Sequence, residues 1–110
     1  MNWLMLLAAL SGALAVGAGA FGAHGASGAA VEWLKTGAQY QIVHAVAALI
    51  AVQSGARGPA WLFVTGGAVF AGTLYLMALG LPRWLGAVTP IGGALLIAGW
   101  LWLVWIAART

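Results

Sequence analysis

The sequence predicts an all-α integral membrane protein, an up-and-down bundle of four transmembrane helices. Composition is the first reason: 65% of the 110 residues are hydrophobic and 5% are charged, whereas soluble domains carry about 25% charged residues. Length is the second, because four spans of about 20 residues and short turns use nearly the whole chain. Residues 1–110 are therefore expected to form one domain with no separate soluble part.

Tryptophan is the third reason, because indole rings prefer the membrane interface. Trp3, Trp33, Trp61 and Trp84 each begin one predicted helix, and the expected ranges are residues 3–23, 33–53, 61–81 and 85–106. The apolar stretch that ends at Val52 is too short to cross a bilayer by itself, so the polar segment before it is placed inside the second span. We expect the first helix to be retained, because it lacks the positive start of a signal peptide.

The charged residues lie at the expected connections and termini: Glu32, Lys35, Arg57, Arg83 and Arg109. Their scatter is unlike the clustered basic patch of a nucleic-acid-binding protein. The amino terminus, Arg57 and Arg109 share one side, so the positive-inside rule favours cytoplasmic termini. The absence of cysteine excludes disulfides, thiolate catalysis and Cys-ligated metals.

Small residues at helical spacing predict how the helices associate, because close packing rather than hydrophobicity joins helices in lipid. Ser11, Ala15, Gly19 and Ala23 recur every four residues and predict a groove on the first helix. On the second helix, a 100° period predicts one face directed at other helices and an opposite face directed at lipid or a partner. The inward residues are Gln41, His44, Ala48 and Ala51, and the outward ones are Ile42, Val46, Leu49 and Ile50.

Polar residues collect towards one side of the predicted bundle, and they are the candidate site: His24, Gln39, Tyr40, Gln41, His44, Thr73, Tyr75 and Thr89. One interpretation is a buried hydrogen-bond network that fixes helix register. The other is a functional site, namely a proton relay, a small-ligand site, or haem or metal ligation by His24 and His44. Two histidines without an acidic partner are a weak metal signal, so no metal site and no cofactor are predicted.

His44 is expected near the middle of its span, where an unpaired imidazole is costly. Its expected partners are Tyr75, Thr73, Thr89, His24 or a backbone carbonyl of the first helix. The segment Thr89-Pro90-Ile91-Gly92-Gly93 has two interpretations: an unwound, ligand-binding stretch, or a first-turn proline followed by packing residues.

Several motifs resemble those of the domain-of-unknown-function family 423, whose animal relatives are called transmembrane protein 256. The matching segments are Gly19-Ala20-Phe21-Gly22-Ala23-His24-Gly25, Gln39-Tyr40-Gln41 with His44-Ala45, Gly72-Thr73-Leu74-Tyr75, Leu85-Gly86, Thr89 to Gly93, and Gly99-Trp100. The resemblance covers nearly the whole chain in the correct order. It implies a small multi-pass membrane protein of bacterial inner membranes, with mitochondrial relatives and no established activity, and it supplies no catalytic residues.

Three functional hypotheses follow from the sequence. The first is a structural or accessory membrane component that joins a larger complex or copies of itself, because 17 glycines exceed what one small bundle needs. The second is an oligomeric transporter, channel or proton relay that uses the polar cluster around His44. The third is a haem-binding or other cofactor-binding protein. No phosphate-binding loop, dinucleotide, zinc-protease or serine-hydrolase motif is present, so an enzyme is not favoured. The expected partners are the lipid bilayer and either copies of the chain or a larger membrane complex, and no nucleic acid is expected.

Overall fold

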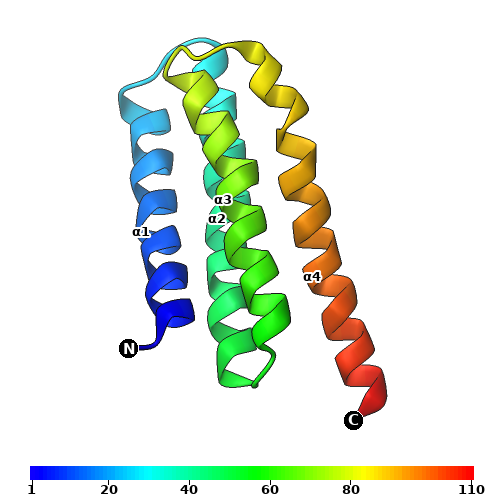
Figure 1. The fold of residues 1–110 in the computed structure, drawn as a ribbon. Coiled ribbons are helices and arrows are strands. Elements are labelled where there is room, and N and C mark those ends of the chain that lie inside the picture. Colours follow the sequence, from blue (N-terminus) through cyan, green and yellow to red (C-terminus); the bar gives the residue numbers. More distant parts are fainter.

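The computed structural model describes residues 1–110 as four long helices and one short 3₁₀ segment (Figure 1). The elements are α1 (Trp3–His24), α2 (Ala29–Gln53), α3 (Arg57–Ala78), η1 (Arg83–Ala87) and α4 (Thr89–Arg109). Successive helices run in opposite directions, so both termini and the α2–α3 turn lie at one end (Figure 1). We call this the terminal end, and the opposite end, with the α1–α2 turn and η1, the loop end.

The four helices do not close into a compact square. α2 and α3 form a central antiparallel pair, with α1 on one side and α4 on the other (Figure 1). α4 diverges from the pair towards the C-terminus, and the molecule measures 47 × 27 × 20 Å. The all-helical, up-and-down order matches the prediction, but α1 and α4 lie far apart instead of completing a ring.

Glycine in the left-handed region ends or precedes three of the helices. Gly28, Gly55 and Gly80 have φ values of 65°, 78° and 103°, and they lie in the α1–α2, α2–α3 and α3–η1 connections. Side chains with a Cβ rarely adopt such values. The chain therefore turns at these points, and α3 ends at Ala78 instead of continuing to the expected residue 81.

Two helices begin four residues before the expected starts. α2 begins at Ala29 instead of Trp33, because two alanines follow Gly28 directly and Glu32 in the first turn interacts favourably with the helix dipole. α3 begins at Arg57 instead of Trp61, with Pro59 in its first turn, where the missing N–H is not needed. The tryptophans thus lie one turn inside these helices.

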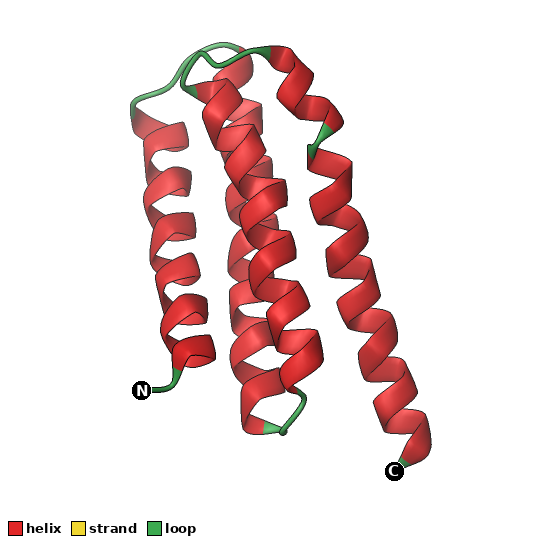
Figure 2. Ribbon diagram, in the orientation of Figure 1, coloured by secondary structure: helices red, strands yellow, loops and turns green.

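The fourth helix is divided (Figure 2). Residues 83–87 form a 3₁₀ segment, and the α-helix begins at Thr89 with Pro90 in its first turn. The region around Pro90 is therefore a helix start with a first-turn proline, not an unwound stretch inside a helix. The expected continuous span from 85 to 106 is interrupted at Val88, because Pro90 lacks the N–H that a helix continuing from residue 86 would need.

α1 packs on α2 through small residues, but the predicted groove is wrong at its far end. The buried residues of α1 are Leu4, Ala8, Ser11, Ala15 and Gly22, whereas Ala23 is exposed. A four-residue interval drifts by about 40° at each step, so a straight contact needs alternating steps of three and four. At Gly22 a Cβ would lie 3.0 Å from the Cβ of Leu34, so Gly22, and not Ala23, makes the close contact with α2.

The apolar core lies towards the terminal end. It consists of small residues around Phe63, which is 1% exposed. Its members are Leu4, Ala8, Ala47, Ala48, Ala51, Ala56, Ala60, Phe63, Val64 and Leu96. The side chains are mostly methyl groups, so the backbones of α1, α2 and α3 approach closely there.

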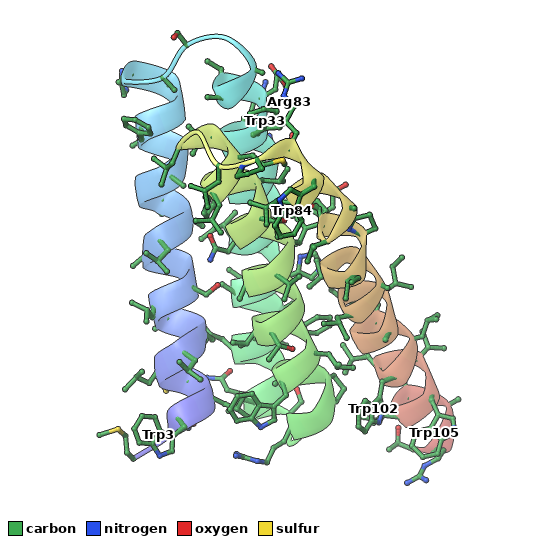
Figure 3. The ribbon with its side chains drawn as sticks, turned by 45° about the horizontal axis from the view of Figure 1, so that its top comes forward. Trp3, Trp33, Arg83, Trp84, Trp102 and Trp105 are labelled. Carbon is green, nitrogen blue, oxygen red and sulfur yellow. The ribbon has the colours of Figure 1, made fainter.

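Tryptophan and arginine mark both ends of the helices. Trp33, Arg83 and Trp84 lie near the loop end, and Trp3, Trp102 and Trp105 lie near the terminal end (Figure 3). The guanidinium groups of Arg83 and Arg109 lie 5.5 Å and 4.1 Å from the ring centroids of Trp33 and Trp105. This is the aromatic and basic arrangement typical of two membrane interfaces.

Three segments are long and apolar enough to cross a bilayer: Trp3–His24, Arg57–Ala78 and Arg83–Arg109. α2 is not among them, since it carries Glu32, Lys35 and several amide or imidazole side chains. The most polar helix therefore occupies the centre of the fold, between α1 and α3 (Figure 1).

Candidate functional site

α2 directs its polar face into the protein. Gln41 and His44 are 4% and 7% exposed, and Ala48 and Ala51 are also buried, so the predicted inward face is confirmed. The predicted outward face is correct at Val46 and Ile50, which are exposed.

Two residues of the predicted outward face are half-buried instead. Ile42 lies beside Gly12 of α1, and Leu49 packs against the apolar core. The exposed arc of α2 is narrower than predicted because α1 and α3 flank this helix on two sides.

His44 bonds with both of its ring nitrogens. Its Nε2 accepts a hydrogen bond from the indole N–H of Trp100 at 2.9 Å, and its Nδ1 lies 2.6 Å from the carbonyl oxygen of Tyr40. An indole nitrogen only donates and a carbonyl oxygen only accepts, so Nδ1 must carry the single proton of a neutral ring. His44 therefore acts as one donor and one acceptor, as expected for a neutral imidazole, but with different partners.

None of the four side chains predicted as partners of His44 bonds to it. Trp100 was not among the predicted partners of His44. The available signal was its place inside the last apolar segment, since an indole N–H away from the interfaces usually needs an acceptor. The rings of Trp100 and His44 also contact Phe63, with centroid distances of 4.9 Å and 5.6 Å.

Gln41 and Tyr75 join α2 to α3. The phenol of Tyr75 donates to Oε1 of Gln41 at 2.7 Å. Gly37, one turn before Gln41, makes this possible, because a Cβ there would lie 2.7 Å from the Tyr75 ring. The tyrosine ring thus lies on the bare backbone of α2, and its hydroxyl reaches the next turn.

Thr73 and Thr89 join α3 to α4. Their hydroxyl oxygens are 2.6 Å apart, and both side chains are buried. The Thr73 hydroxyl also lies within hydrogen-bond distance of the carbonyls of Val69 and Phe70, and Thr89 lies 3.4 Å from the carbonyl of Leu85. The pair therefore fixes the first turn of α4 against α3, directly after the 3₁₀ segment.

The other three candidates lie outside the hydrogen-bonded pairs, although the ring of Tyr40 stacks against that of His44 with a centroid distance of 6.4 Å. His24, Gln39 and Tyr40 are exposed, and their side chains make no hydrogen bond within the chain. His24 ends α1 in the α1–α2 turn, whereas His44 lies about 22 Å along α2 by helical rise. Both nitrogens of His44 are also engaged, so the two histidines do not form a shared ligand pair.

A groove opens laterally beside His44, where α4 diverges from α2. It has a volume of about 290 Å³, and its lining is mainly aromatic and aliphatic. The lining residues are Tyr40, His44, Phe70, Gly93, Leu96, Ile97 and Trp100. The groove borders the hydrogen-bonded pair of His44 and Trp100.

The family model described as "Protein of unknown function (DUF423)" matches residues 18–93, which include all eight candidate residues. The chain belongs to this family. The resemblance inferred from the motifs is thus confirmed, and the description of the DUF423 family assigns no activity.

Several full-length relatives of this family are named as membrane proteins. A UPF0382 membrane protein of Staphylococcus haemolyticus is 42% identical and aligns over 94% of this chain and 93% of its own length. The UPF0382 membrane protein YwdK of Bacillus subtilis is 36% identical and aligns over 99% of this chain and 98% of its own length. The UPF0382 inner membrane protein YgdD of Escherichia coli K12 is 39% identical and aligns over 90% of this chain and 84% of its own length. No solved structure matches the chain.

Proposed function

We propose that this DUF423 chain spans the membrane four times as a structural or accessory component, which assembles with a larger membrane complex or with copies of itself. α2 supports the fourth span, since its 25 residues cover about 37 Å between two apolar helices of similar length. Gln41 and His44 are turned inward, and the exposed residues between positions 43 and 50, namely Val43, Val46 and Ile50, are aliphatic.

One observation carries the structural role: the buried polar side chains bond to one another across helices. Three contacts link α2 to α3, α3 to α4 and α2 to α4. No buried side-chain nitrogen or oxygen is left without a partner. A cluster in which each fully buried polar side-chain atom has a partner within the chain favours a network that fixes helix register.

Glycines that the chain's own packing does not need support an assembly role. A Cβ at Gly17 on α1 or at Gly72 on α3 would meet nothing within 4 Å. Ala68, one turn from Gly72, is exposed. Glycine in a helix interior is destabilising by about 1 kcal/mol relative to alanine. Close approach of a helix from a partner would explain why glycine is present at these positions.

Photo-crosslinking tests the assembly proposal. The chain has no cysteine, so a probe attached to an introduced cysteine reports on that position alone. A benzophenone attached to Ala68→Cys in native membranes is expected to give one discrete protein adduct. The matched position is Ile97→Cys on α4, which is also exposed but lies outside the glycine-bearing surface. If neither position gave an adduct and the protein were a monomer in mild detergent, an assembly through α3 would be ruled out.

We propose further that the protein lies in the inner membrane with both termini in the cytoplasm. The name of the Escherichia coli relative supports the location, and Arg57, Arg109 and the amino terminus at one end support the orientation. An impermeant maleimide should label a cysteine introduced at Gly28 in intact cells, but not one at Ser54. The reverse pattern would invert the orientation.

The second candidate function is an oligomeric transporter, channel or proton relay. It is favoured by the lateral groove, where His44 lies beside Trp100. In proteoliposomes with an internal pH dye, such a relay would dissipate an imposed pH gradient, and His44→Ala would abolish this. A pH gradient as stable as that of empty liposomes would exclude the relay and favour the structural proposal.

A further inference from the structure

A second groove, whose lining does not include His44, runs along the exposed side of the α1–α2 interface. Its part near the loop end has a volume of about 280 Å³, and the adjoining part has about 210 Å³. The two parts share Gly19, Ala38 and Gln39, so they form one hollow. Glycine and alanine make its floor, and this keeps the hollow open beside two closely packed helices.

Two polar side chains line this hollow. Lys35 lies at the part near the loop end, and Gln39 follows one helical turn deeper on the same face. Both are exposed, and neither takes part in the hydrogen-bond network. Gln39 lies about 9 Å below the interfacial Trp33 by helical rise, where an unpaired amide facing hydrocarbon is costly.

The spacing of these two groups matches the layers of one phospholipid. Lys35 and Gln39 are separated by about 6 Å along the helix. The headgroup layer on each side of a bilayer is about 5–7 Å thick, so an ammonium at phosphate level places the amide at ester level. Below Gln39 the hollow is apolar, bordered by Ala15, Val16, Ala20 and Ile42.

We propose that this groove binds one anionic phospholipid in the leaflet at the loop end. Lys35 pairs with the phosphate, the Gln39 amide donates to an ester carbonyl, and an acyl chain lies along the small-residue floor. Charge complementarity selects an anionic headgroup, since Lys35 is the cation that lines the groove. The site is independent of the proposed assembly role, because neither polar residue belongs to the internal network.

Native mass spectrometry of the full chain tests this proposal. The protein is taken from nanodiscs of equimolar phosphatidylglycerol and phosphatidylcholine with identical acyl chains. We expect one retained phosphatidylglycerol in about fivefold excess over phosphatidylcholine, which corresponds to one lysine near the surface. Lys35→Gln should bring the ratio close to one, and Glu32→Gln should raise it by removing a nearby negative charge.

Two further variants separate a groove from general surface charge. Arg109→Gln removes an equal charge at the terminal end and should leave the ratio unchanged. Ala23→Phe fills the exposed part of the groove without touching the core, and it should lower the retention of both lipids. An unchanged ratio in Lys35→Gln, an equal loss in Arg109→Gln, or full retention in Ala23→Phe would each overturn the proposal.

Discussion

The α1–α2 interface and the α3–α4 interface both join helices in lipid, but with different side chains. α1 meets α2 through small residues such as Gly19, where a Cβ would lie 3.5 Å from that of Ala38. No side-chain hydrogen bond crosses this interface. α3 and α4 approach more closely, because a Cβ at Gly92 would overlap the backbone nitrogen of Phe70, and they also share the Thr73–Thr89 contact.

This difference suggests separate roles for close packing and for hydrogen bonds. Packing of small residues supplies most of the association energy in lipid, because apolar side chains gain little by leaving lipid tails for one another. Individual hydrogen bonds between membrane helices contribute less, about 0.6 kcal/mol on average and at most about 1.7 kcal/mol. They act only at fixed positions, so they select one register among several that small residues would permit.

The largest effect is therefore expected from a single methyl group at the α3–α4 contact. In Gly92→Ala the added Cβ would also lie 2.8 Å from the Gly66 carbonyl oxygen, so the helices must separate. We expect the free energy of unfolding to fall by about 3 kcal/mol, the upper part of the overpacking range. Reversible unfolding in a mixed-micelle detergent titration measures it.

Gly93→Ala is the matched control for this prediction. A Cβ there would lie 3.8 Å from the Phe70 ring, which is an ordinary contact. Alanine also has the higher helix propensity, so this variant should be neutral or more stable by up to about 1 kcal/mol. Equal destabilisation by the two variants would mean that glycine at position 92 does not set the approach of α4.

A smaller effect is expected at the bond between α2 and α4. His44→Ala should lower the free energy of unfolding by about 1–2 kcal/mol, and Trp100→Phe should remove the indole donor while keeping a ring against Phe63. A double-mutant cycle between the two should give a coupling of about 0.6–1.7 kcal/mol. Unchanged stability of His44→Ala in detergent would contradict the structural role of the cluster.

Helix number followed from the sequence because it depends on composition and on the length of the apolar segments, and the inward face of α2 followed because it depends on local periodicity. The burial of Gln41 and His44 needed only a 100° period and the cost of polar atoms in lipid. The bond of His44 to Trp100 did not follow, because 56 residues separate them and the divergence of α4 decides which residue reaches α2.

Gly37 shows the same limit of a sequence argument. As one more glycine in a small-residue chain it carries no distinct signal, yet in the structure it accommodates the ring of Tyr75. Its role depends on how α3 is rotated about its own axis. The helical period of α2 gives no information about that rotation.

The smallest effect is expected at Thr73, where the interhelical bond has local substitutes. In Thr73→Val the bond to Thr89 is lost, but the Thr89 hydroxyl can rotate towards the Leu85 carbonyl, 3.4 Å away. Thr65→Val is the matched control, because Thr65 is exposed on the same helix and its hydroxyl bonds to the Trp61 carbonyl of its own helix. The difference between the two variants in free energy of unfolding then reports the interhelical part alone. We expect about 0.5 kcal/mol, below the average for such bonds. A difference above about 1.7 kcal/mol would mean that this hydrogen bond, and not the close approach at Gly92, holds the start of α4 against α3.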